Sequence, residues 1–177
     1  LMREMNSPYM GLPGPPNVLL RNSGDGKFQI VHESPLRVFK NTYQATWGDF
    51  DGDGKPDLFL ANDFNTPTLF RNLGEGRFGD VTESMGLAEA RFGMGASWGD
   101  YDNDGRSDLY ISAMSSKAGR RILAQLPNVN PGLAAMAAGN ALYRNLPGQF
   151  ERVSGAAPPR RKTGSEAGAA EASRTLL

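Results

Sequence analysis

Two stretches of this 177-residue chain have nearly the same sequence, 51 residues apart. Residues 47–60 read WGDFDGDGKPDLFL, and residues 98–111 read WGDYDNDGRSDLYI. Each stretch places carboxylates at positions 1, 3, 5 and 9 of a loop, with glycine at position 6 and an apolar run straight afterwards. An internal repeat of this length indicates an architecture built from one repeated structural unit.

A second pattern extends the repeat. Three segments each contain an apolar strand ending in Arg-Asn, a glycine turn and a second strand containing phenylalanine. They are NVLLRNSGDGKFQIV from Asn17, PTLFRNLGEGRFGDV from Pro67 and NALYRNLPGQFERV from Asn140. Together the two patterns give a unit of about 50 residues with four short strands, which is typical of one β-propeller blade. No helical period of 3.6 residues runs through these segments.

We therefore predict an all-β fold, a partial β-propeller of about two and a half four-stranded antiparallel blades within residues 1–154. The expected parts are a partial blade at about 1–35, a blade at about 42–85, and a blade at about 94–154 with an insertion at 115–139. The expected strands of the two full blades are 43–48, 58–61, 68–71, 77–81, 95–99, 109–113, 141–144 and 149–153. The tail at 155–177 is rich in Ala, Gly and Ser, so we expect it to be disordered.

The two aspartate loops are candidate metal sites. Their carboxylates are Asp49, Asp51, Asp53 and Asp57 in the first loop and Asp100, Asp102, Asp104 and Asp108 in the second. Carboxylates this close repel one another, and a hard divalent cation relieves that repulsion. Calcium takes six to eight oxygens in flexible geometry, which suits these side chains and a backbone carbonyl at position 7, where Lys55 and Arg106 stand. The glycine at position 6 allows the sharp turn. We predict two Ca²⁺ sites.

Other interpretations of the loops fit less well. An EF-hand needs flanking helices and a glutamate at position 12, where this chain has Leu60 or Ile111 inside an apolar strand. Magnesium prefers fewer protein ligands, and transition metals prefer histidine or cysteine. A solvated turn without metal would explain a single loop of this kind, but two matching loops weaken that explanation.

The stretch WGDFDGDGKPDLFLAN, followed by TLFRNLGEGRFGDVTESMGL, resembles the FG-GAP-like repeats, also called VCBS repeats. These repeats form the calcium-binding propellers of integrin alpha subunits and of many bacterial secreted proteins. The pattern RNxGxGxFxDVTxxxGL is most similar to the ASPIC/UnbV-associated, cartilage-acidic-protein-like bacterial group, although the ASPIC/UnbV module itself is not seen. The resemblance covers about Asn17 to Val153. It implies calcium binding by the eight loop aspartates and the carbonyls of Lys55 and Arg106.

The composition excludes or disfavours several classes of function. Nineteen basic and nineteen acidic residues give zero net charge, so nothing global indicates nucleic acid or an anionic membrane as a partner. The chain has no cysteine, which excludes disulfides and thiol catalysis, and no apolar run approaches the ~18 residues of a membrane span. It also lacks a Ser/His/Asp set and a phosphate-binding glycine loop. We therefore expect no enzyme activity.

The leading interpretation is a calcium-stabilised propeller that binds a protein or glycan, as in cell adhesion. The alternative is the scaffold of a secreted polysaccharide-active enzyme whose catalytic residues lie outside this chain, and a third is a spacer module. A propeller closes its ring with four to eight blades, so we expect the remaining blades outside this chain. Extracellular calcium modules bind weakly, so we also expect export, with the signal outside this sequence.

Several single residues have a sharper and a plainer interpretation. We expect Trp47 and Trp98 to pack between blades, the alternative being a ligand platform. Three asparagines are expected to bond backbone in the turn after their strand, namely Asn22, Asn72 and Asn145. His32, the only histidine, is expected on the surface or in packing. The insertion at 115–139, with two candidate short helices, would either bind a partner or be neutral decoration.

Overall fold

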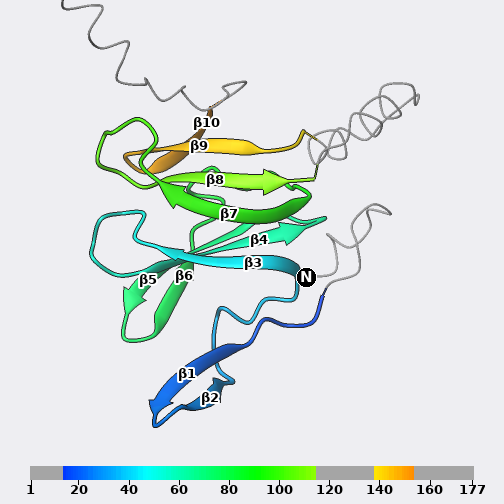
Figure 1. The fold of residues 1–177 in the computed structure, drawn as a ribbon, viewed down its shortest axis with the longest axis vertical. Helices are drawn as coiled ribbons and strands as arrows, with labels where there is room; N and C mark the ends of the chain where they lie inside the picture. Colours follow the sequence, from blue (N-terminus) through cyan, green and yellow to red (C-terminus); the bar gives the residue numbers. More distant parts are fainter. Residues whose placement is uncertain (1–13, 115–137, 154–177) are drawn as a thin grey trace, which may run out of the picture.

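The structure is a computed structural model that describes residues 14–114 and 138–153. These residues form ten strands in three antiparallel sheets (Figure 1). The strands are β1 (Leu19–Gly24), β2 (Lys27–Val31), β3 (Asn41–Gly48), β4 (Asp57–Asp63), β5 (Thr68–Gly74), β6 (Arg77–Asp80), β7 (Gly93–Gly99), β8 (Asp108–Ala113), β9 (Ala141–Leu146) and β10 (Gln149–Val153).

Each full sheet is a simple meander. Strands β3 to β6 pair in chain order, as do β7 to β10, while β1 and β2 form a separate hairpin. The prediction of an all-β fold with two four-stranded antiparallel blades, preceded by a hairpin, is confirmed. The observed strands match the expected ones and extend most of them by one to three residues, because pairing continues through the polar residues at the strand ends; β6 ends one residue earlier than expected.

The side chains of β4 show how the sheets are layered. The whole strand is buried, because alternate side chains point to opposite faces of a sheet and both faces are covered. Phe59 and Ala61 join the apolar core shared with the second sheet, whereas Leu58 and Leu60 join a smaller cluster with Leu36. The β3–β6 sheet therefore lies between the β7–β10 sheet and the segment that carries the β1–β2 hairpin (Figure 1).

The second sheet has one covered face among the described residues. Leu109 and Ile111 of β8 are buried in the shared core. Tyr110 lies between them and points to the opposite face, where it is 39% exposed. Strand β8 therefore alternates in burial, unlike the fully buried β4.

Trp98 packs between the blades, as predicted. Its indole lies 6.2 Å from the Phe59 ring and 6.1 Å from the Phe150 ring, measured between centroids. The same indole covers Gly48 at the end of β3, where an added Cβ would lie 2.5 Å from Trp98 Cδ1. Trp47, its counterpart in the preceding blade, is 48% exposed and packs only partly, near Phe78.

Arg91, in the connection between the blades, is buried and contacts the second blade. The Arg91 side chain is 1% exposed, and its guanidinium donates to the Tyr143 hydroxyl from both Nε (3.2 Å) and Nη2 (2.9 Å). It also forms an ion pair with Glu89 and lies over the Tyr143 ring. A buried guanidinium is stable only when it is paired and hydrogen-bonded, and this one is.

The expected helices of the insertion and the expected disordered tail lie outside the described residues, apart from the insertion's last two residues. No helix in residues 14–114 and 138–153 has the length and hydrophobicity needed to cross a membrane.

Candidate metal centre

Both aspartate loops join the first two strands of a blade. The first loop, residues 49–57, leaves β3 and enters β4, and the second loop, residues 100–108, leaves β7 and enters β8. Gly54 and Gly105 have φ angles of 81° and 85°, a left-handed conformation that glycine adopts without strain. Strands on both sides of each loop, in place of helices, exclude the EF-hand arrangement.

The first carboxylate of each loop organises the loop backbone. Asp49 Oδ1 accepts from the Gly52 N–H at 2.8 Å, and its Oδ2 accepts from the Gly54 N–H at 2.8 Å. Asp100 Oδ2 accepts from the Gly105 N–H at 2.9 Å in the same way. These bonds curl the chain around the carboxylate at position 1.

The carboxylate at position 9 of each loop is buried. Asp57 is fully buried and accepts from the backbone N–H groups of Phe50 at 3.1 Å and Asn72 at 2.7 Å. Asp108, 1% exposed, accepts from Tyr101 and Asn145 in the matching way. Burial raises the pKa of Asp57, partly offset by its two hydrogen bonds. A nearby cation would favour the ionised form of this carboxyl.

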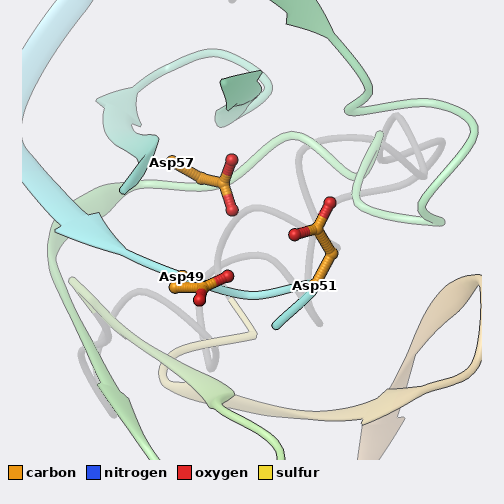
Figure 2. Close-up of side chains that lie close together, drawn as sticks. All are labelled: Asp49, Asp51 and Asp57. Carbon is orange, nitrogen blue, oxygen red and sulfur yellow. The ribbon is translucent and has the colours of Figure 1, made fainter. Parts of the chain in front are cut away.

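Three carboxylates converge in each loop. One oxygen from each of Asp49, Asp51 and Asp57 lies within 4.8 Å of the others, and Figure 2 shows these side chains facing one another. The second loop brings three together in the same way, namely Asp100, Asp102 and Asp108.

The donor set fits a hard cation such as calcium. Every donor is a carboxylate oxygen, and the separations allow one ion to contact all three. Asp102 Oδ1 is buried and has no hydrogen-bond partner among the described residues, so it is an acceptor without a donor. Buried polar atoms normally find a partner, and a bound cation would supply one here.

The carboxylates at position 5 of the loops, Asp53 and Asp104, are not members of these triads. Asp53 Oδ2 pairs with Lys55 Nζ at 2.8 Å, and Asp104 pairs with Arg106. The hydrogen bond from the Lys55 side chain lowers the pKa of Asp53. Ligation by Asp53, Asp104 and the carbonyls of Lys55 and Arg106 therefore stays a prediction.

Sequence reasoning missed an arginine at each loop. Arg71 Nε lies 2.5 Å from Asp51 Oδ2, and Arg144 Nε lies 2.6 Å from Asp102 Oδ2, the latter without hydrogen-bond alignment. Each guanidinium offsets part of the negative charge of its loop. The signal was available in the sequence, because both belong to the repeated Arg-Asn pair at the third strand of a blade.

The asparagines of that pair partly follow the prediction. Asn22 Oδ1 and Asn72 Oδ1 accept from the glycine N–H two residues later, each at 2.9 Å. Asn145 instead has its Nδ2 bonded to the Phe50 carbonyl in the first loop at 2.6 Å and to Ser107. His32 is exposed, follows the last residue of β2, and forms no hydrogen bond to either loop among those of the described residues.

A groove of about 670 Å³ lies beside the loops, between the two blades. Its lining combines loop carboxylates with other residues of both blades and of the connection between them, including Asp49, Asp51, Arg71, Ser84, Arg106 and Asn145. A ligand in this groove would contact both blades together with Asp49 and Asp51 of the first triad.

Comparison with known families agrees with this geometry. The sequence profile of the FG-GAP-like repeat matches the chain twice, over residues 10–60 and 49–111, which together make up more than half of its length. The first loop belongs to both matches, and the second loop to the second. No curated protein matched the chain. The repeat is typically non-catalytic, and no catalytic family was found. The chain therefore belongs to the FG-GAP-like repeat family.

Proposed function

We propose that this chain is a non-enzymatic, calcium-binding propeller module of an exported protein. The observation that carries the proposal is the convergence of two aspartate triads. Each triad includes a buried carboxylate at loop position 9 that accepts hydrogen bonds from two backbone N–H groups. Calcium binds the folded loops and neutralises their charge, and it stabilises the fold by mass action. At one hundred times Kd the gain is about 2.7 kcal/mol per site.

Thermal melting of the full chain tests this role. We expect calcium to raise the melting temperature relative to chelator, and we expect Asp49→Ala and Asp100→Ala each to remove part of that shift. Glu83→Gln is the matched control, because it removes one exposed carboxylate outside both loops. Equal melting with calcium and with chelator, or equal protection by magnesium, would contradict the proposal.

We further propose that the groove between the blades binds a protein or glycan ligand. Its support is its position, since it collects side chains from two blades beside the first triad. Weak calcium affinity suits a compartment with abundant calcium, which favours an extracellular or cell-surface setting. The exposed Trp47 and the open face around Tyr110 favour further blades as neighbours within the complete protein.

A glycan array and cell-surface binding, each with calcium and with chelator, test ligand binding. Ser84→Trp places a bulky side chain in the groove, whereas Glu83→Trp adds the same ring beside it. We expect the first variant to abolish binding and the second to retain it, with both melting normally. Binding that survives Ser84→Trp would place the ligand elsewhere.

A further inference from the structure

A buried chain of hydrogen bonds joins the two aspartate loops. The Phe50 N–H donates to Asp57 Oδ2 at 3.1 Å, and the Phe50 carbonyl accepts from Asn145 Nδ2 at 2.6 Å. The Asn145 N–H in turn donates to Asp108 Oδ1 at 2.8 Å. All four residues are at most 6% exposed. Two residues, Phe50 and Asn145, therefore link the buried carboxylate of the first loop to that of the second.

The matching asparagine of the preceding blade makes the local bonds without this link. The Asn72 N–H donates to Asp57, and its Nδ2 donates to the Pro56 carbonyl at 2.9 Å. Asn145 has the equivalent bond to the Ser107 carbonyl at 3.0 Å and the bond to Phe50 in addition. Within the described residues the two asparagines thus differ in two bonds: Asn145 has the bond between blades, and Asn72 has instead the local bond that its Oδ1 accepts from the Gly74 N–H.

We propose that Asn145 is a positioning residue that couples the two calcium sites, so that an ion in one loop raises the affinity of the other. The proposal rests on the calcium function proposed above. Phe50 stands between Asp49 and Asp51, so an ion held by both carboxylates also fixes the Phe50 carbonyl. That carbonyl holds the Asn145 side chain, and the Asn145 N–H holds Asp108.

The coupling works through ordering. An ion in the first loop fixes one end of a hydrogen-bonded chain whose other end orients the carboxylate of the second loop. Binding of the second ion then costs the second loop less conformational entropy. Linkage makes the effect reciprocal, so the second site must strengthen the first by the same factor.

Calcium titration calorimetry on the full chain measures the coupling. Asp49→Ala leaves only the second site, and Asp100→Ala leaves only the first. We expect the affinity of the second binding step in the unmodified chain to exceed, by about fivefold, the value that the two single-site affinities predict for independent sites. That factor is at the lower end of allosteric couplings and equivalent to one hydrogen bond. In the Asn145→Ala background the excess should vanish, whereas in the matched Asn72→Ala background it should persist.

A second measurement keeps the Asn145 side chain intact. In the Asp100→Ala chain, calcium can load only the first loop. We expect that calcium to slow hydrogen exchange of the Asn145 backbone amide, which lies in the other blade. The Ala113 amide, bonded to Asn140 outside this path, serves as the control and should not change. An Asn145 amide that exchanges equally with and without calcium would overturn the coupling.

The outcomes separate the two proposals. If the unmodified chain binds no calcium, or binds as the Asp49→Ala/Asp100→Ala double variant does, the calcium function fails and the coupling with it. If each loop binds calcium with an affinity indifferent to the other, the function stands and the coupling fails. If coupling persists in Asn145→Ala, the connection runs through other residues and Asn145 is not its carrier.

Discussion

Replacing Gly48 with alanine tests the contact that holds the second blade on the first. An alanine Cβ at this position would lie 2.5 Å from Cδ1, 2.7 Å from Cγ and 2.7 Å from Nε1 of the Trp98 indole. The indole has little room to move, because Phe59 and Phe150 pack beside it. Overpacking of this kind costs about 1–3 kcal/mol of folding free energy.

Gly99 provides a matched control. It ends β7 just as Gly48 ends β3, and each glycine precedes the first carboxylate of a loop. Among the described residues, apart from Gly99 itself and its two chain neighbours, no heavy atom lies within 4 Å of the Cβ position of Gly99. Both substitutions reduce the entropy of the unfolded chain, which stabilises by about 0.4–1 kcal/mol where the backbone tolerates alanine. That gain cancels in the comparison, so the two variants should differ by the clash alone, about 1–3 kcal/mol.

Urea unfolding followed by tryptophan fluorescence and circular dichroism, at one fixed calcium concentration, measures the difference. We expect Gly99→Ala to match or exceed the stability of the unmodified chain and Gly48→Ala to fall below it. Equal free energies of unfolding for the two variants would refute the packing of Trp98 on Gly48.

The remaining predictions concern the side chains of Tyr143, Asp57 and Asp51. Tyr143→Phe removes the acceptor for two Arg91 donors and should cost about 1–3 kcal/mol in urea unfolding. Burial raises the pKa of Tyr143, so its contribution is complete below about pH 10 and is lost as the pH rises further; Tyr143→Phe should therefore flatten the alkaline loss of stability. Asp57→Ala should destabilise even in chelator, by at least about 1 kcal/mol, because two buried N–H groups lose their acceptor. Asp51→Ala removes a surface ion pair and one exposed hydrogen bond from the Asp53 N–H, and in chelator it should cost less than about 1 kcal/mol. Equal losses for the two aspartates would therefore contradict the geometry.

The strands could be predicted from sequence because both determinants are local. Alternating apolar residues and glycine turns recur at nearly fixed spacing, so each four-stranded sheet was expected close to its observed limits. The converging triads also follow locally, since a tight loop brings positions 1, 3 and 9 together. Burial on both faces of β4 was not predictable, because it depends on what packs against the sheet from outside the blade.

The link between the loops could not be predicted for a similar reason. Asn72 and Asn145 follow the same arginine in the same strand of their blades, so the sequence does not distinguish them. Only Asn145 has a preceding blade, within the described residues, whose loop offers a carbonyl. The pairing of Arg71 and Arg144 with their loops was missed because it joins the third strand to a loop well before it in the chain.

The packing of Trp98 on Gly48 is directional, and this direction suggests how a protein built from such blades can grow. The contact joins unlike surfaces, a protruding ring on one blade and a bare backbone on the other. Within the described residues each side of this contact also occurs without its partner. The equivalent tryptophan of the first blade, Trp47, is exposed, and the equivalent glycine of the second blade, Gly99, is not covered by a ring. Duplication of the coding sequence for one blade therefore supplies a new blade that carries both the tryptophan and the glycine of this contact, so that it packs on its neighbour in the same orientation. Such a protein can lengthen by copying alone, without having to evolve a new interface at each step.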